Sequence, residues 1–420
     1  MTALLFSVFI IGLALGIPIA FAIAIAGVTV LVKGDVNLLI IVQRLFAATD
    51  SFPLVAVPFF ILAGDLLARG AMSQKLVTFA ESLLGKVRGG LSVVSVVAGM
   101  FFAAISGSGA ATTAAVGATL IPELKKRGYN EDSSAALIAS AGCIGVVIPP
   151  SVPMVLYAVI ADQSVTQLFK NGFLPGFMMG GVLIAISLYQ AYKYNYPNGI
   201  AFSWKNVWTT FKQAIWGLMM PLIILGGIFS GYFTPSEAAA VAVVYSMLVS
   251  MFLYRDLTLK ELGKIMLNSA KTSAIIMIII ACSGVFGWVL ANWKIPEAVA
   301  QGILSISTDK YIILFLIAVI ILIAGVFMET SSAVILLTPV FLPLVSMLGI
   351  NLVHFGIIFT VGISIGMITP PVAINLFVAS SITGMPIEKI AKAVVPYLIG
   401  LIVIFFLYIY LPFLIPGLIV

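Results

Sequence analysis

The sequence predicts an all-α polytopic membrane protein made of inverted structural repeats, each with a re-entrant helical hairpin and a broken transmembrane helix. Hydropathy, an internal repeat and the placement of basic residues support this fold class. Of the 420 residues, 62% are hydrophobic and 9% are charged, and the mean hydropathy is +1.22. A soluble core cannot use so much apolar sequence, whereas a bilayer about 30 Å thick needs helices of about 20 such residues.

An internal repeat appears when the chain is compared with itself at a shift of 221 residues. Without gaps, Gly-Val-Val-Ile-Pro-Pro at 145–150 falls on Gly-Met-Ile-Thr-Pro-Pro at 366–371. Membrane transporters are commonly built from such repeats. Other residues that coincide at this shift are Pro122 with Pro343, Gly128 with Gly349, Asn130 with Asn351, and Pro175 with Pro396.

Basic residues indicate that the two halves are inverted. Clusters at 86–88 and 125–127 bracket one polar stretch and place both of its ends in the cytoplasm, where Lys and Arg are enriched. A membrane segment with both ends on one side is a re-entrant hairpin, predicted over 90–124. The matching hairpin at 311–347 has few basic residues around it, so we expect its ends in the periplasm. The same threading predicts a cytoplasmic N-terminus and a periplasmic C-terminus.

The remaining elements follow from apolar runs and their breaks. In the first repeat we expect a span at 4–32 that stays in the mature protein, an interfacial helix at 36–48, a span at 52–68, a cytoplasmic arm at 72–86, a broken span at 131–160 and a span at 172–192. An arm and a linking span at 203–232 join the halves. In the second repeat we expect a span at 235–253, a cytoplasmic arm at 257–268, a span at 272–291, a periplasmic arm at 296–307, a broken span at 352–380 and a final span at 395–418.

Each hairpin has a polar tip within an apolar run, Ser-Gly-Ser-Gly at 106–109 and the segment 327–334. Non-helical backbone at membrane depth must lie inside protein, because lipid cannot satisfy free N–H and C=O groups. The Gly-x-x-x-Pro-Pro segments predict the unwound positions opposite these tips. Free carbonyls and tip hydroxyls suit a small hard cation, and helix N-termini attract a carboxylate. The alternative is that these residues only kink helices and allow close packing.

The chain resembles the large membrane subunit of tripartite ATP-independent periplasmic (TRAP) transporters over essentially its full length, and five segments carry the resemblance. They are PFFILAGDLL at 58–67, SGSGAATTAAVGA at 106–118, IGVVIPPS at 144–151, TPSEAAAVA at 234–242 and GMITPPVAINLFV at 366–378. The resemblance implies an elevator-type fold in the bacterial inner membrane. It also implies a scaffold (1–88 and 196–308) and a moving transport domain (89–195 and 309–420).

The family resemblance further implies sodium-coupled uptake of an organic acid, such as a C4-dicarboxylate, a sialic acid or a related carboxylate. The implied partners are a small Q-type membrane subunit and a periplasmic P-type substrate-binding protein. We expect Na⁺ at two pseudo-symmetric sites, one from Ser106, Gly145, Val147 and Pro149, and one from Gly325, Met328, Thr330, Gly366 and Thr369. We expect the substrate at Ser108, Gly109, Glu329, Thr330, Ser331, Ser332 and Asn375.

Glu329 carries the strongest single-residue prediction, because an ionisable side chain within an apolar run is functional by default. A helix-capping role is its alternative. Asp65 and Arg69 lie one turn apart, which favours an ion pair. Glu237 follows Thr-Pro-Ser at a predicted helix start, which favours a structural role.

The sequence gives little support to an enzymatic function. The sequence has no Walker A motif, and its one histidine, His354, lies far from the Ser-Gly-Ser-Gly tip, where a serine protease would need a base. Cys143 and Cys282 have no metal-site or disulfide spacing. The main rival is a stand-alone sodium-coupled anion carrier or ion antiporter with a similar inverted-repeat fold.

Overall fold

The computed structural model describes residues 1–68, 71–84, 87–198 and 202–414, and within these ranges every regular element is a helix. Seven helices of the described part are long and apolar enough to cross a membrane, or eight if one bent pair is a single span. The chain is therefore an all-α polytopic membrane protein, as predicted.

The N-terminal apolar run forms two helices, α1 (Thr2–Ala14) and α2 (Ile19–Lys33), which pack side by side. The prediction of one span over 4–32 is wrong. Gly16 adopts a left-handed φ of +78°, and Pro18 precedes α2. A glycine at positive φ and a proline end a helix whatever its hydropathy, so the chain turns back at this point.

Two further helices are longer than predicted. The arm and span expected at 257–268 and 272–291 form one helix, α13 (Leu259–Asn292), of 34 residues. No glycine or proline occurs from 264 to 283, so nothing in that stretch interrupts the helix. The arm and linking span at 203–232 likewise form a single helix, α11 (Trp204–Phe229).

The other scaffold elements are close to their predicted positions. They are α3 (Leu39–Thr49), a 3₁₀ turn (Phe52–Val55), α4 (Ala56–Ala68), α5 (Ala71–Leu84), α12 (Pro235–Leu248), which a π-helical turn extends to Leu253, and α14 (Ile295–Ile306). The chain bends by 66° between α3 and the 3₁₀ turn that leads into α4. This bend separates the predicted interfacial helix from the span that follows it.

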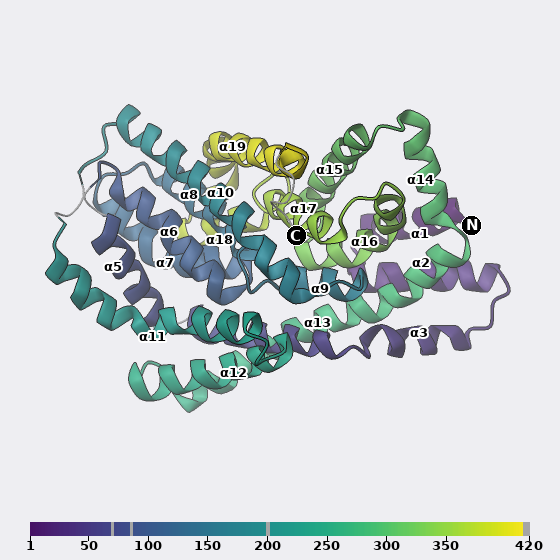
Figure 1. Ribbon diagram of the computed structural model, residues 1–420, viewed down its shortest axis with the longest axis horizontal. Helices are drawn as coiled ribbons and strands as arrows, with labels where there is room; N and C mark the ends of the chain where they lie inside the picture. Colours follow the sequence, from purple (N-terminus) through teal and green to yellow (C-terminus); the bar gives the residue numbers. More distant parts are fainter. Residues whose placement is uncertain (69–70, 85–86, 199–201, 415–420) are drawn as a thin grey trace.

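Both predicted hairpins and both broken spans are present. The hairpins are α6 (Gly90–Ser106) with α7 (Gly109–Lys126), and α15 (Lys310–Phe327) with α16 (Thr330–Met347). The broken spans are α8 (Glu131–Cys143) with α9 (Val152–Ile160), and α17 (Leu352–Gly366) with α18 (Ile374–Thr383). Figure 1 shows the hairpins toward opposite ends of the molecule, as inverted repeats require. The long helices α10 (Val165–Lys193) and α19 (Ile387–Leu414) complete the repeats, and 415–418 of the predicted final span lie outside the described residues.

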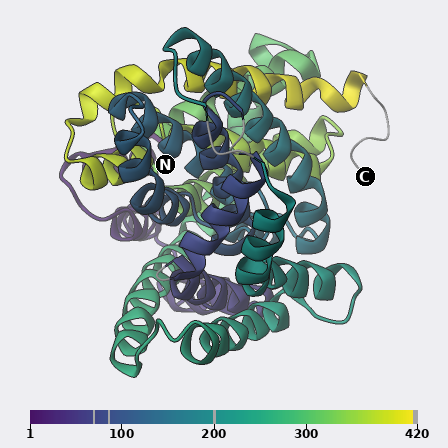
Figure 2. The ribbon, with the colours of Figure 1, turned by 90° about the vertical axis from the view of Figure 1, so that its left-hand side faces the viewer.

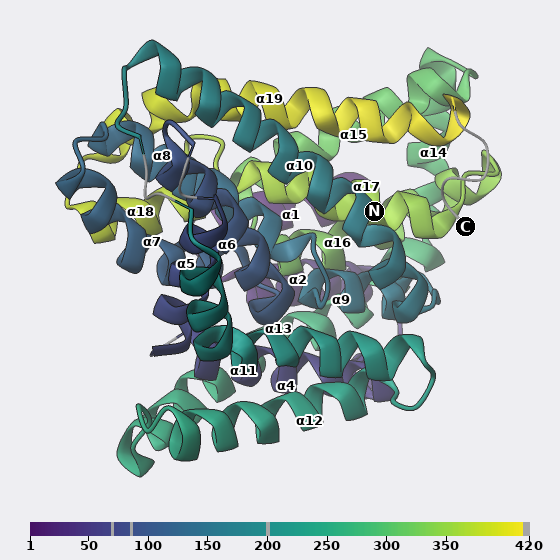
Figure 3. The same ribbon diagram turned by 60° about the vertical axis from the view of Figure 1, so that its left-hand side comes forward.

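The helices pack in two groups. Helices α2, α3 and α4 contact α13, and α12 contacts α4. Figure 3 shows α4, α12 and α13 on its lower side. The hairpins and broken spans pack with α10 and α19, and Figure 2 shows yellow α19 across the upper side, away from α12 and α13. The groups also contact each other, since α4 packs on α6 and α13 packs on α16. The division into a scaffold and a moving transport domain stays a prediction.

Helix α5 lies between the two groups. Its Ser82 hydroxyl is 2.8 Å from the hydroxyl of Thr210 on α11. On the hairpin side, Glu81 forms an ion pair of 2.7 Å with Arg127 at the end of α7. The predicted arm therefore contacts both the linking helix and the first hairpin.

Glycines bring each hairpin into backbone contact with the nearby break. Gly107, at a φ of +61°, leaves no room for a Cβ, which would lie 2.8 Å from the carbonyl oxygen of Pro150. A Cβ on Gly366 would meet the backbone carbonyl of Gly325 in the second hairpin. Each predicted pair of hairpin and break is therefore in direct contact.

Gly366→Ala should lower the apparent unfolding temperature of the purified protein by several degrees, because its methyl group would overlap the Gly325 backbone, which cannot rotate away. Gly287→Ala on α13 is the matched control, since its Cβ would meet no atom within 4 Å. Thermal unfolding followed by size-exclusion chromatography measures both. Equal stability of the two variants would contradict the close contact.

Candidate transport site

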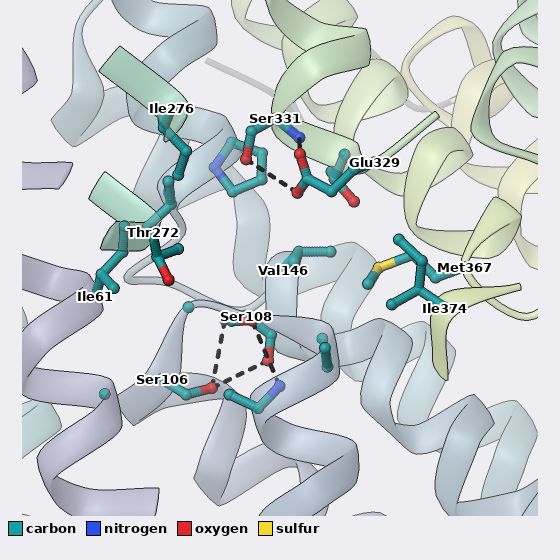
Figure 4. A pocket seen from close by; sticks show the side chains of 18 of the residues that line it. Ile61, Ser106, Ser108, Val146, Thr272, Ile276, Glu329, Ser331, Met367 and Ile374 are labelled. Carbon is teal, nitrogen blue, oxygen red and sulfur yellow. Dashed lines mark hydrogen bonds between the residues drawn. The ribbon is translucent and has the colours of Figure 1, made fainter. Parts of the chain in front are cut away.

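The two hairpin tips and both breaks meet at one cavity of about 340 Å³. Figure 4 shows Glu329 and Ser331 facing Ser106 and Ser108 across it. The breaks contribute Val146 from the first repeat and Met367 from the second. The other lining residues come from α4 and α13, from the first tip, and from the first turns of α7, α9, α16 and α18. They are Ile61, Gly64, Asp65, Gly107, Gly109, Ala110, Ala111, Val152, Pro153, Thr272, Ile276, Thr330 and Ile374.

The first tip is held by its own hydroxyl groups. Ser106 Oγ lies 2.8 Å from Thr112 Oγ1 and donates to the carbonyl oxygen of Ser108 at 3.2 Å. Ser108 caps α7, and its Oγ accepts the amide hydrogen of Ala111 at 3.4 Å. The tip therefore directs the N-terminus of α7, with its partial positive charge, toward the cavity.

The second tip is capped by Glu329. Its carboxylate accepts the backbone N–H groups of Ser331 and Ser332 at 2.9 and 3.1 Å and the Ser331 hydroxyl at 3.1 Å. The side chain also lines the cavity and is exposed there. Glu329 therefore caps α16, the alternative role that the sequence suggested, and its carboxylate also lies on the cavity wall.

A third wall comes from α4 and α13, and sequence reasoning missed it. Asp65 lines the cavity and accepts a hydrogen bond of 2.6 Å from the hydroxyl of Ser269 on α13. Thr272 and Ile276 line the same wall. The predicted partner of Asp65, Arg69, lies outside the described residues. Ile61 and Asp65 lie one turn apart, so the sequence indicated that they share one face of α4. Only the packing of α4 against α13 brings that face to the hairpin tips.

The cavity is rich in acceptors. Its described lining includes the carboxylates of Asp65 and Glu329 and no Lys, Arg or His. Glu329 already engages two of the first N–H groups of α16, whereas Ser108 engages one of those of α7, that of Ala111. A cation beside the tips would counter the negative charge of the two carboxylates.

Oxygen atoms converge where the predicted first cation site lies. A Cβ on Gly145 would come within 2.6 Å of Thr112 Oγ1 and 2.7 Å of the carbonyl oxygen of Ser108. Ser106 is hydrogen-bonded to the same threonine. Thr112, which the predicted set omits, therefore belongs to this cluster. Val147 and Pro149 are buried in the same break.

The second predicted cation site brings together the hairpin α15–α16 and the break after α17. Gly325 and Gly366 are in backbone contact. Thr330 Oγ1 is buried and has no hydrogen-bond partner among the described residues. Thr369 Oγ1 donates to the carbonyl oxygen of Ile365 at 2.9 Å, and Met328 lies directly before the tip. Polar oxygen atoms are therefore present here as well, although less densely than at the first site.

Two predicted substrate residues lie away from the cavity wall. Asn375 is fully buried, and its Nδ2 donates to the carbonyl oxygen of Ala139 on α8 at 3.0 Å. It therefore joins the broken spans of the two repeats. Ser332 is also buried, behind Glu329. Of the predicted substrate set, the cavity brings together Ser108, Gly109, Glu329, Thr330 and Ser331.

This fold, with two hairpin tips and two breaks around one cavity, is that of a secondary transporter of the inverted-repeat class. The sequence profile described as "Tripartite ATP-independent periplasmic transporter, DctM component" matches residues 6–414. The chain belongs to this family. It is 40% identical over 369 residues to the C4-dicarboxylate TRAP transporter large permease protein DctM of Pseudomonas aeruginosa, covering 88% of this chain and 86% of that protein.

Other relatives carry different substrate names. Identity is 36% over 402 residues with the 2,3-diketo-L-gulonate TRAP transporter large permease protein YiaN of Escherichia coli, covering 96% of this chain and 95% of that one. Identity is 40% over 413 residues with the isethionate TRAP transporter permease protein DctMQ of Oleidesulfovibrio alaskensis, covering 97% of this chain but 65% of that protein. The chain thus spans less than two thirds of the latter's length.

A solved structure shares the fold. The crystal structure of the YdaH transporter of Alcanivorax borkumensis matches with a TM-score of 0.63 and 16% sequence identity, covering 90% of this chain and 88% of that one. At this identity the likeness concerns the fold alone.

Cysteine labelling tests the cavity wall after Cys143 and Cys282, both buried, have been replaced by serine. Ser108→Cys and Thr272→Cys should react readily with a small water-soluble thiol reagent, because both positions line the cavity. Asn375→Cys should react far more slowly, because that position is fully buried. Comparable rates at all three positions would contradict the cavity described above.

Proposed function

We propose that the chain is the membrane permease for sodium-coupled uptake of an organic acid across the bacterial inner membrane. The observation that carries this proposal is the meeting of both hairpin tips and both breaks at one cavity, in a member of the DctM family. Discontinuous helices at such a junction supply carbonyl ligands for a coupling ion and helix N-termini for an anion. The chain's chemistry is binding and release, not bond cleavage.

The acceptor-rich cavity supports the coupling of sodium to the anion. An organic acid entering beside Asp65 and Glu329 would meet like charge, which disfavours binding. Na⁺ at the oxygen clusters near Gly145 and Gly366 would lower that barrier and complete the site. The substrate carboxylate would then lie at the N-terminus of α7, where Ser108 and Gly109 are located.

Transport would follow an elevator movement in which the hairpins and broken spans move against α4 and α13. The cavity supports this mechanism because the hairpins, which we propose to move, supply the tips, whereas α4 and α13, which we propose to stay fixed, supply Asp65 and Thr272. We propose a cytoplasmic base for the first hairpin and a periplasmic C-terminus. The sequence alone favoured a cytoplasmic N-terminus, on the expectation of one span over 4–32. Because α1 and α2 double back, we propose instead that the N-terminus lies on the same side as Lys33, the periplasmic side in this orientation.

The partners proposed for the chain are a small Q-type membrane subunit and a periplasmic P-type substrate-binding protein. Relatives named for C4-dicarboxylates, 2,3-diketo-L-gulonate and isethionate are similarly close, so the substrate is proposed only as an organic acid. The alternative is a stand-alone carrier. Uptake by vesicles that contain this chain alone would favour the carrier, and dependence on both added partners would favour the TRAP arrangement.

Sodium dependence is the direct test of this function. Vesicles containing the chain and its small subunit, supplied with the binding protein and a panel of labelled organic acids, should take up one acid at a rate that rises more than linearly with sodium. Two cooperating sites give this dependence. Initial-rate uptake with sodium replaced by potassium provides the control, and undiminished rates there would exclude sodium coupling.

Glu329→Gln should insert and assemble normally but lose most sodium-driven uptake. The glutamine oxygen retains the capping geometry at α16, whereas the negative charge at the cavity is removed. The matched control is Glu237→Gln, whose carboxylate caps α12 by accepting the Thr234 N–H at 2.8 Å outside the cavity.

The control should affect thermal stability more than uptake per folded molecule. Uptake assays and unfolding curves on the same preparations separate these effects. Near-normal uptake by folded Glu329→Gln protein would assign this residue to capping alone.

A further inference from the structure

A second cavity, of about 420 Å³, lies along helices α6 and α10 and shares no lining residue with the transport site. Its wall is wholly apolar and includes Met100, Phe101, Phe173, Phe177 and Ile184. Gly181 on α10 also lines this cavity, and a Cβ there would meet no atom within 4 Å. We call this feature the α6–α10 groove.

The length of the α6–α10 groove fits one leaflet of a bilayer. Phe173, Phe177, Gly181 and Ile184 recur at helical spacing and form a stripe along α10. From the first to the last of them the helix rises about 16 Å, at 1.5 Å per residue. This is roughly half of the ~30 Å hydrocarbon thickness, so an occupant of this length would reach from the headgroup level to the midplane.

A lysine stands at one end of the stripe. Lys170 precedes Phe173 by one turn and is exposed, with its ammonium 5.7 Å from the ring centre of Phe229 at the end of α11. Phe229 contacts Phe173 edge-on at 6.4 Å between ring centres. The positive charge is therefore held at the edge of the groove, where α10 begins and α11 ends.

We propose that the α6–α10 groove binds an acyl chain of an anionic phospholipid, whose headgroup phosphate pairs with Lys170. An apolar wall one leaflet deep fits the acyl chain, and a cation at its outer end fits the phosphate. In a membrane-spanning chain the bilayer supplies this ligand at high local concentration. The groove shares no lining residue with the organic-acid cavity, and its Ile148 lies in the first break, between Val147 and Pro149 of the predicted first sodium site.

Filling the groove should displace the lipid. Gly181→Leu places a side chain in the open space without backbone strain, since the glycine is helical and has no positive φ. The matched control is Gly226→Leu on α11, also helical and also free of neighbours within 4 Å. Lys170→Gln removes the charge and leaves the apolar wall intact.

The measurement is native mass spectrometry of the purified chain after incubation with phosphatidylglycerol or phosphatidylethanolamine in detergent, with unfolding temperatures recorded in parallel. The wild type and Gly226→Leu should retain one phosphatidylglycerol through detergent exchange, and Gly181→Leu should lose most of it. Lys170→Gln should reduce the preference for phosphatidylglycerol about fivefold, the effect of one lysine near a membrane surface.

Folded Gly181→Leu that retains lipid as the wild type does would overturn the site, and so would equal losses in both leucine variants. If Gly181→Leu fails to fold, Lys170→Gln decides. An unchanged preference between the two lipids in that variant would overturn the proposal.

Discussion

The structure depends on one constraint: backbone groups released from a helix within a membrane must be satisfied by protein, because lipid offers no hydrogen bonds. Among the described residues, the two tips and the two breaks interrupt helices and pack together in the interior. Gly107 packs against Pro150, and Gly366 packs against Gly325. A side chain at Gly107 or at Gly366 would push the two backbones apart. Close packing therefore requires glycine at these positions of the repeat, in addition to the need to end or break a helix there.

The same constraint concentrates polar atoms where a transporter can use them. Hydroxyls of Ser106 and Thr112, the carbonyl of Ser108 and the N-terminus of α7 lie together at the first tip. Glu329 at the second tip and Asp65 on α4 add negative charge on the facing walls. Because the tips and the helices α4 and α13 all supply walls of the cavity, relative movement between them would change its shape.

Much of the fold was predictable, because the glycines and prolines that end or break its helices occur at matching positions in both repeats. The hairpins at 90–124 and 311–347 follow from polar tips in apolar runs and from the repeated breaks. The turn within 4–32 was missed because hydropathy alone does not register a reversal between two equally apolar helices. Asp65 was missed as a cavity residue, and the burial of Asn375 was not anticipated, because both depend on which helices pack together. Sequence periodicity specifies helix faces but not their partners.

Sided labelling tests the inverted arrangement of the hairpins most directly. In a background with Cys143 and Cys282 replaced by serine, single cysteines are placed at Lys126, at the end of α7, and at Ser307, before α15. A membrane-impermeant thiol reagent is then applied to intact spheroplasts and to inside-out vesicles. The account predicts that Ser307→Cys is labelled from the periplasmic side and Lys126→Cys from the cytoplasmic side. Labelling of both positions from the same side would contradict it.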